Sequence, residues 1–230
     1  MNQKVTRAII LKRVNYAESD RIVTVLTPND GRLSLIAKGV RKVKSKLAGG
    51  LELFSVIDIT YIKGRGEVDT LVSARLVKFY DHILRDIDRV EVAYELLKTV
   101  SKIVEDQYDK AYFELVEQVF ELLNEPKANS HRIRTWYLSR LLLLGGHQPN
   151  LLTDVNSGPL VAGNNYVFDL ESMTFEQSLK GSFGTSEIKL LRLLFNQEDS
   201  KTLFVLTPNP AVESEVGSLV EAMARTQLSL

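Results

Sequence analysis

Five short segments with the composition of β-strands follow one another within the first 80 residues of the chain. They are rich in Val, Ile, Leu and Thr, as strands usually are, and turn-forming stretches such as Pro28-Asn-Asp-Gly31 separate them. The expected strands cover residues 4–13, 21–27, 32–37, 53–62 and 67–78. Five strands with a longer insert after the third predict a small Greek-key barrel of the OB type, although an SH3-like barrel also has about five strands.

After residue 80 the apolar residues recur with the period of an α-helix. A first helix is expected from Asp88, where Glu91 completes a capping-box arrangement, and its buried face is expected to hold Val90, Ala93, Tyr94, Leu97 and Val104. A second helix should stop before Pro126, a third should cover 131–144, a fourth should start at Ser186, and the last should follow Pro210. We therefore predict an α+β protein with an N-terminal five-stranded OB-type β-barrel, residues 1–80, followed by a mainly α-helical domain, residues 81–230, with a long loop region at about 147–185.

Charge is divided unevenly along the chain. The formal net charge is zero, from 29 basic and 29 acidic residues. Residues 1–80 hold 15 of the basic and 7 of the acidic residues, whereas residues 81–230 hold the remaining 14 and 22. A basic front on an acidic body indicates that the front meets a polyanion.

The basic excess is concentrated after the third expected strand. No acidic residue occurs between Asp30 and Glu52, and five cations arrive close together: Lys38, Arg41, Lys42, Lys44 and Lys46. Lys63 and Arg65 lie in the next turn-like stretch. Closely spaced cations attract polyanions, so we predict that these side chains bind nucleic acid. The alternative is a solvated, mobile loop without a ligand.

The aromatic residues of the basic part are few, and most occupy strand positions that should face a core: Tyr16, Phe54, Tyr61, Phe79 and Tyr80. Proteins that bind single strands of any sequence usually stack the bases on aromatic rings. A surface with many cations and few aromatic rings would instead hold phosphates and leave the base edges free. Such a surface permits the annealing of two strands.

Several other classes of function are disfavoured. The chain has no cysteine, which excludes disulfides, thiolate zinc sites and cysteine catalysis. No phosphate-binding-loop spacing occurs, and His82, His131 and His147 are too scattered for a zinc-protease motif. We therefore expect neither an enzyme nor a cofactor. No apolar run reaches the roughly 20 residues of a membrane span, and the N-terminal apolar stretch is too short for a secretory signal, so we expect a cytoplasmic location.

A set of short motifs, specific only in combination, resembles a known family. The motifs are Ala8-Ile-Ile-Leu-Lys-Arg13, Glu18-Ser-Asp-Arg21, Thr27-Pro-Asn-Asp-Gly31, Ala37-Lys-Gly-Val-Arg41, Lys44-Ser-Lys46 and Leu144-Gly-Gly-His-Gln-Pro-Asn-Leu151. In order and spacing they resemble RecO, the family of bacterial recombination mediators. The resemblance is strong to about residue 80 and weak beyond residue 160.

This resemblance implies an OB fold followed by a helical domain. It also implies a non-enzymatic mediator of DNA repair and recombination, nucleoid-associated in the cytoplasm, that binds single- and double-stranded DNA and anneals complementary strands. With RecR, such a mediator helps to load RecA onto DNA coated by single-stranded DNA-binding protein (SSB). The alternative is an OB-fold RNA-binding module without a recombination role, because OB folds accept both nucleic acids.

The chain departs from the family pattern in the region 147–185. Many RecO proteins carry two Cys-x-x-Cys pairs there. Our register places Asp154 and Ser157 at the first pair, and Glu176 and Leu179 near the second. Ser and Leu do not complete a closed zinc site, so we expect a degenerate zinc loop without metal.

RecO proteins also recognise the acidic C-terminal tail of SSB. Such a ligand needs a hydrophobic pocket with cations at its rim, and the expected helix 131–144 offers both. We predict that the peptide contacts Arg134, helped by Arg132, Trp136 and Arg140. The alternative is that the apolar stripe of this helix is core and that its arginines pair with acidic neighbours.

Overall fold

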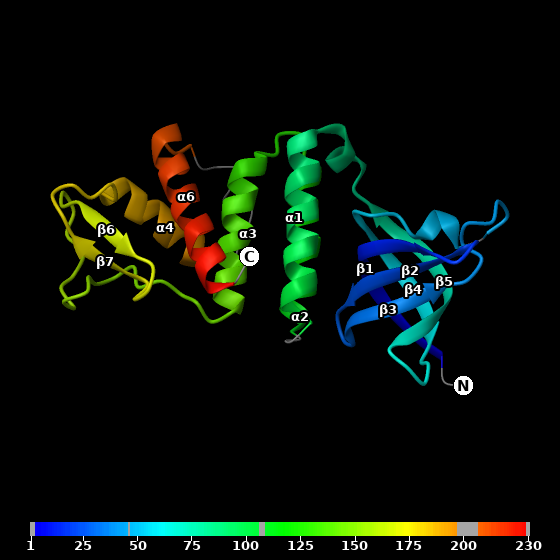
Figure 1. Ribbon diagram of the computed structural model, residues 1–230. Coiled ribbons are helices and arrows are strands. Elements are labelled where there is room, and N and C mark those ends of the chain that lie inside the picture. Colours follow the sequence, from blue (N-terminus) through cyan, green and yellow to red (C-terminus); the bar gives the residue numbers. More distant parts are fainter. Residues whose placement is uncertain (1–2, 46, 106–108, 197–206, 229–230) are drawn as a thin grey trace. The chain divides into compact units, whose positions relative to one another are not determined.

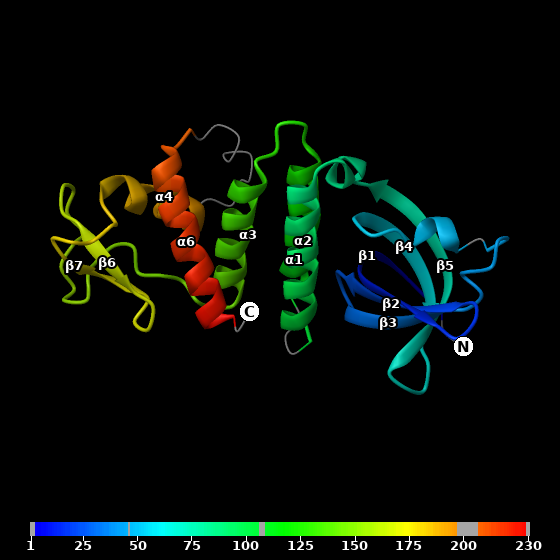
Figure 2. The ribbon, with the colours of Figure 1, turned by 45° about the horizontal axis from the view of Figure 1, so that its top comes forward.

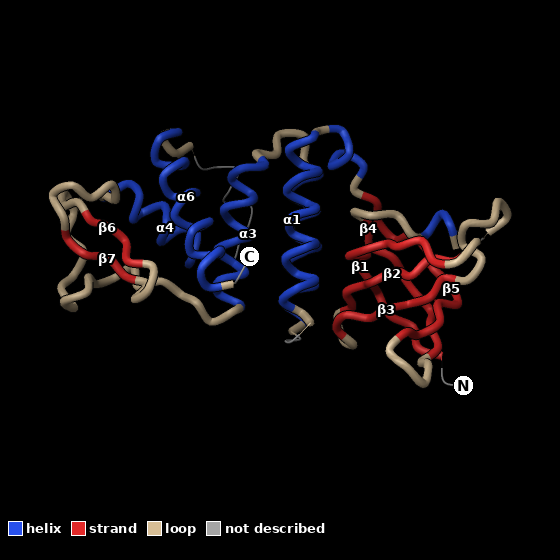
Figure 3. Tube along the Cα trace, in the orientation of Figure 1, coloured by secondary structure: helices blue, strands red, loops and turns tan. Residues whose placement is uncertain are grey.

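The computed structural model describes residues 3–45, 47–105, 109–196 and 207–228. The chain divides into two compact units, Met1–Lys127 and Ala128–Leu230, each of which is described by itself (Figure 1). Strands make up much of the first unit, whereas the second is mainly helical with one small sheet (Figure 3). Among the described helices, none has both the length and the apolar character that crossing a membrane requires.

Five strands close into a barrel at the start of the first unit. They are β1 (Gln3–Tyr16), β2 (Asp20–Thr27), β3 (Gly31–Ala37), β4 (Ser55–Ile62) and β5 (Val68–Phe79). Their order around the barrel is β1-β2-β3-β5-β4. The β3–β5 pair is parallel and the other pairs are antiparallel. This five-stranded Greek-key barrel followed by helices confirms the predicted α+β class and the OB-type barrel.

The barrel core follows from the alternation of side chains along each strand. In β4, Ile57, Ile59 and Tyr61 are each at most 1% exposed, whereas Asp58 lies on the outer face and pairs with Arg75 of β5. Successive side chains of a strand point to opposite faces, so one face of β4 fills the barrel. Each such buried apolar side chain contributes about 1.5–3 kcal/mol to folding.

A β-bulge interrupts β1. The residues from Ala8 to Leu11 are all buried, although a regular strand would turn every second side chain to its other face. Ala8 and Ile10 belong to the barrel core, whereas Ile9 is buried on the outer face, where helices contact β1 and β2. The register with β2 then shifts between Ile10 and Lys12. Bulges of this kind redirect side chains, and here Lys12 is exposed directly after the buried run.

Two helices complete the first unit: α1 (Ile87–Ile103) and α2 (Lys110–Asn124). They pack against each other beside the barrel (Figure 2). The expected cap of α1 at Asp88 was wrong by two residues. Asp86 is the N-cap, because its Oδ1 accepts hydrogen bonds from the backbone N–H groups of Asp88 at 3.0 Å and Arg89 at 3.1 Å.

Aromatic side chains join the barrel to these helices. Phe54, just before β4, meets Tyr94 of α1 edge to face with ring centroids 5.1 Å apart, and Phe120 of α2 at 5.8 Å. Tyr80 packs on the same Phe120 ring at 5.4 Å. The change from strands to helices therefore falls near residue 80 as expected, while the compact unit continues to Lys127. The division into domains 1–80 and 81–230 stays a prediction.

The second unit holds the helices α3 (Ser130–Leu144), α4 (Thr185–Asn196) and α6 (Pro210–Gln227). These three helices contact one another. The expected loop region contains a hairpin of β6 (Tyr166–Asp169) and β7 (Thr174–Gln177). Four buried rings form a small aromatic core around this hairpin: Tyr166, Phe168, Phe175 and Phe183.

Candidate nucleic-acid interface

The basic loop follows β3 and is anchored to the barrel at its start, by residues 39–41. Val40 is 3% exposed and packs into the barrel core. The backbone N–H of Gly39, at φ +64°, donates to Asp20 Oδ1 at 2.7 Å, and the backbone N–H of Arg41 donates to the carbonyl of Ser19 at 2.9 Å. These bonds tie the loop to the β1–β2 turn, so its backbone has a defined course.

The cations of the loop point to solvent. Lys38, Arg41, Lys42 and Lys44 are exposed, and Lys46 lies outside the described residues. Arg41 Nη1 also donates to the carbonyl of Glu18 at 3.1 Å, a contact that positions this side chain. Because Val40 and its neighbours hold the loop while the charged side chains stay in water, the loop presents a cationic surface.

The second predicted cluster lies elsewhere on the barrel. Lys63 and Arg65 are exposed in the β4–β5 turn. The start of β5 pairs in parallel with β3, Val68 opposite Ser34, so this turn lies at the end of the barrel where β3 begins. The basic loop leaves from the other end of β3, after Ala37. Lys63 and Arg65 were predicted to bind nucleic acid together with the basic loop, but in the structure the two clusters lie at opposite ends of β3.

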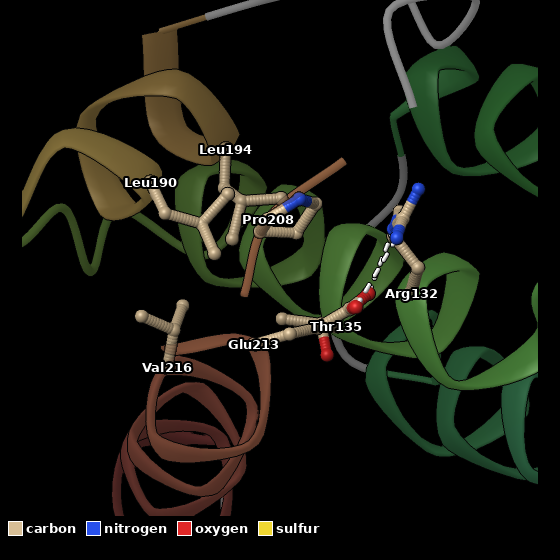
Figure 4. A pocket seen from close by; sticks show the side chains of 7 residues that line it. All are labelled: Arg132, Thr135, Leu190, Leu194, Pro208, Glu213 and Val216. Carbon is tan, nitrogen blue, oxygen red and sulfur yellow. Dashed lines mark hydrogen bonds and ion pairs between the residues drawn. The ribbon is translucent and has the colours of Figure 1, made fainter. Parts of the chain in front are cut away.

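The arginines of α3 have carboxylate partners inside the second unit. Arg132 Nε lies 2.7 Å from Glu213 Oε1 and its Nη2 lies 3.1 Å from Oε2 (Figure 4), while Arg134 Nη1 lies 3.0 Å from Glu221 Oε2. Both carboxylates come from α6. Trp136 is 2% exposed. These contacts favour the alternative, in which the helix is core and its arginines are paired, and the predicted peptide site stays a prediction.

A small hollow does lie beside Arg132 (Figure 4). Its lining is mostly apolar, with the Arg132–Glu213 pair on one side: Arg132, Thr135, Leu190, Leu194, Pro208, Glu213 and Val216. Arg140 is half-buried on the same helix, and within the described ranges no side chain bonds to it. A cation-rimmed apolar hollow is therefore present, although its rim arginine is already engaged.

Two of the expected zinc-loop positions, Asp154 and Ser157, lie in one hydrogen-bonded turn, whereas Glu176 lies in β7 and Leu179 follows it. Asp154 Oδ1 accepts from the backbone N–H groups of Asn156 and Gly158, both at 2.9 Å. The N–H of Ser157, at φ +65°, donates to the Asp154 carbonyl. The carboxylate thus fills the middle of the turn. In the parts of the chain that the structure describes, no three His, Asp or Glu side chains come together as a metal site would require.

A groove between the barrel and α1 was not predicted from the sequence. It has a volume of about 750 Å³. Five cations and one carboxylate are among its lining residues, which are Leu11, Lys12, Arg13, Thr24, Arg32, Leu53, Tyr94, Leu97, Lys98, Ser101, Lys102 and Glu105. Tyr94, expected in the buried face of its helix, is 49% exposed. The groove could have been predicted from the four-residue spacing of Tyr94, Lys98 and Lys102, because this spacing places all three on one helical face.

Comparison with known proteins agrees with both parts of the fold. A family model described as "Recombination protein O N terminal" matches residues 1–80, and one described as "Recombination protein O C terminal" matches residues 84–230. The chain belongs to the RecO family. The change between the two RecO models falls where the strands give way to helices.

Individual RecO proteins are similar over much or all of the chain. "DNA repair protein RecO" of Acetivibrio thermocellus is 26% identical over 236 residues, which cover 99% of this chain and 93% of that protein. The Roseiflexus protein of the same name is 30% identical, with 96% and 79% covered. The match to the Desulfatibacillum aliphaticivorans protein, 30% identical, covers 64% of this chain and only 58% of that relative.

Proposed function

We propose that this RecO-family protein is a DNA-binding mediator of repair and recombination, and that it holds DNA on the basic loop. The observation that carries the proposal is the exposed set of Lys38, Arg41, Lys42 and Lys44 on a loop whose backbone is fixed by hydrogen bonds to the β1–β2 turn. A fixed cationic loop binds phosphates without a large loss of its own conformational freedom.

Annealing follows from the same geometry. The loop offers ammonium and guanidinium groups, and its own hydrophobic residues carry no aromatic ring. Phosphate contacts position a nucleic acid without reading its bases. A strand held by its phosphates keeps its base edges available to a complementary strand. The protein would need no cofactor for this role, because it lowers repulsion between strands and breaks no covalent bond.

In this proposal the protein acts with RecR on SSB-coated DNA, in the cytoplasm at the nucleoid. The SSB tail would reach the hollow beside α3, where its carboxylates compete with Glu213 for Arg132. Along the same helix they would compete with Glu221 for Arg134. Exchange of one carboxylate for another leaves the arginines paired throughout. This exchange is what makes a preformed ion pair compatible with an acidic ligand.

DNA binding is tested with two matched double variants. Lys42→Ala/Lys44→Ala removes two exposed loop lysines, and Lys180→Ala/Lys189→Ala removes two exposed lysines of the second unit. The loop variant should lower the slope of log affinity against log salt for duplex DNA by about 0.9 for each lysine that contacts a phosphate, and the control should leave it unchanged. Equal slopes in the parent and the loop variant would exclude the loop as the site. Tighter binding of RNA than of either DNA form would favour the RNA-binding alternative.

The peptide site is tested with Arg134→Ala and Glu221→Gln. Both variants break the same ion pair, but only the first removes the cation that a peptide carboxylate needs. An SSB-tail peptide should bind Arg134→Ala about tenfold more weakly and Glu221→Gln at least as tightly as the parent. If both variants bind the peptide like the parent protein, the tail does not use Arg134.

A further inference from the structure

We infer that the groove between the barrel and α1 binds a single nucleic-acid strand, with phosphates along its lysines and one base stacked on Tyr94. The inference rests on the proposed nucleic-acid binding but assigns it a second surface, lined by β1, β2, β3 and α1 and distinct from the basic loop. Double-stranded DNA would use the loop, whereas the groove would select a single strand.

The charge of the groove runs against the composition of its helix. Residues 81–127 carry 6 basic and 12 acidic residues, yet Lys98 and Lys102 both line the groove. The barrel side adds Lys12, Arg13 and Arg32. An acidic helix pair that turns its lysines toward a basic wall concentrates positive potential in the space between them.

Two of the cations hold the walls in place. Arg32 Nη1 donates to the Ser101 carbonyl at 3.0 Å and lies 3.0 Å from Glu105 Oε1, which ties β3 to α1 and neutralises the only carboxylate among the lining residues. Arg13 Nη1 donates to the Leu51 carbonyl at 2.7 Å and contacts Glu52. These contacts fix the walls of the groove before a ligand binds. Binding therefore costs less conformational entropy.

Two of the other cations remain available to a ligand. Lys12 and Lys98 are exposed on opposite walls, and across the described ranges neither has a hydrogen-bond or ion-pair partner. Along α1, Tyr94, Lys98 and Lys102 follow one another every four residues, about 6 Å per step. They span about 12 Å, the length that a few successive phosphates of one strand occupy.

Tyr94 supplies the contact that a duplex could not use. Its ring is braced edge to face by Phe54, a buried residue held at φ +57°. Positive φ is unfavourable for a bulky side chain, and residues held so are frequent at ligand sites. The β-bulge of β1 lies in the facing wall. Bases in a duplex are stacked and paired, so only an unpaired base can lie on Tyr94.

The size of the groove agrees with this ligand. A volume of about 750 Å³ lies within the roughly 300–1,000 Å³ of sites for small molecules, which suits a short segment of one strand. An acidic peptide could pair with the lysines but has no planar base for the tyrosine. The half-exposed ring beside lysines therefore favours a nucleic acid over an acidic peptide.

The test compares Tyr94→Leu, Tyr94→Phe and Lys12→Ala/Lys98→Ala with the control Lys180→Ala/Lys189→Ala. The probes are a labelled oligodeoxythymidylate of about 16 nucleotides, at the upper end of OB-fold site sizes, the matching duplex, and a labelled poly-glutamate peptide. Tyr94→Leu should weaken single-strand binding roughly fivefold or more, and Tyr94→Phe should retain it because the stacking face is kept. The lysine variant should lower the single-strand salt slope by about 0.7 per contact, with duplex binding unchanged.

Thermal unfolding of each variant, together with the Tyr94→Phe result, separates a lost contact from a lost fold. If the loop variant loses DNA and the groove variants bind the single strand like the parent, the groove inference is overturned while the proposed function stands. If the parent binds no DNA, the proposed function itself fails. If only the poly-glutamate peptide depends on Lys12 and Lys98, the groove is a peptide site and the inference is wrong.

Discussion

Glu221 of α6 forms ion pairs that join two helices of the second unit. It lies between Arg134 of α3 and Arg225 one turn further along its own helix. The hydrogen bond from Arg134 lowers the pKa of the Glu221 carboxyl below its ordinary value, with the charge of Arg225 acting in the same direction and burial opposing both. A lowered pKa means that folding favours the ionised form, so the ion pair stabilises α3 against α6 only while Glu221 is charged.

We predict that Glu221→Gln reduces the pH dependence of unfolding. The contribution of Glu221 is fully present above about pH 4.3, the ordinary pKa of Glu, and is lost as the pH falls through the lower folded pKa. The variant should therefore be about 1 kcal/mol less stable than the parent at pH 7, and the difference should shrink toward pH 3. Denaturant unfolding at both pH values measures it. Arg134→Ala should remove the same dependence, and equal pH profiles for variant and parent would contradict the assignment.

Some of the candidate binding residues could be predicted from the sequence, and others could not. The basic residues of the loop were visible because they lie close together in sequence, whereas the groove cations come from β1, β3 and α1 and meet only in the fold. Tyr94 was wrongly expected in the buried face of α1. Helical periodicity does not decide whether a residue at the edge of an apolar stripe is buried or exposed. The partners Glu213 and Glu221 lie far along the chain from α3, beyond the reach of any local pattern.

At the scale of elements, the turn at residues 154–158 holds Asp154 and Ser157, which our register aligns with the first Cys-x-x-Cys pair of RecO proteins, an assignment that stays a prediction. Its carboxylate bonds to two backbone N–H groups, and the hairpin beside it has its own aromatic core. The isolated bridge between Asp154 and Phe175 joins turn and hairpin. Hydrogen bonds and ring packing thus join this turn and the hairpin.

We predict that Asp154→Ala lowers the unfolding free energy of the second unit by about 1 kcal/mol, because two backbone donors lose their acceptor. Asp154→Asn should cost less, since its side-chain oxygen can still accept. Thermal unfolding measures the effect, and a chelator should leave the melting temperature of the parent protein unchanged. Stoichiometric zinc in the purified protein, or a melting temperature that falls with chelator, would be evidence against a metal-free turn.

Some strands and helices could be predicted from the sequence more accurately than others. Long alternating or helical patterns located the barrel strands and main helices to within a few residues. The four-residue strands β6 and β7 were not predicted. Turn-forming residues surround them, and four positions are too few to reveal an alternation of polar and apolar residues. The N-cap of α1 was misplaced because Asp86 and Asp88 are chemically equivalent, and only the backbone geometry distinguishes them.

At the scale of the whole molecule, the compact units do not coincide with the change from strands to helices. α1 and α2 belong to the same unit as the barrel and cover buried residues of it, including Ile9, Leu26, Phe54 and Tyr80. Removing these helices would expose several large apolar side chains to water. The first 80 residues therefore need the helix pair for much of their stability.

We predict that a fragment of residues 1–127 unfolds in one cooperative transition, whereas a fragment of residues 1–80 is several kcal/mol less stable. The reason is the apolar area that α1 and α2 bury, at about 1.5–3 kcal/mol for each large side chain. Thermal unfolding and binding of a hydrophobic dye distinguish the two fragments. Equal melting temperatures would show that the barrel is an independent domain ending near residue 80.

The closure of the barrel has a consequence for the nascent chain. β1 pairs with β4 and β3 pairs with β5, so the meander β1-β2-β3 leaves the ribosome with both of its edges open until β4 and β5 follow. Open edges pair with other chains, and flanking charges suppress such pairing. The basic loop is synthesised directly after β3. The lysines proposed to hold DNA in the finished protein would thus also keep unfinished copies apart by mutual repulsion.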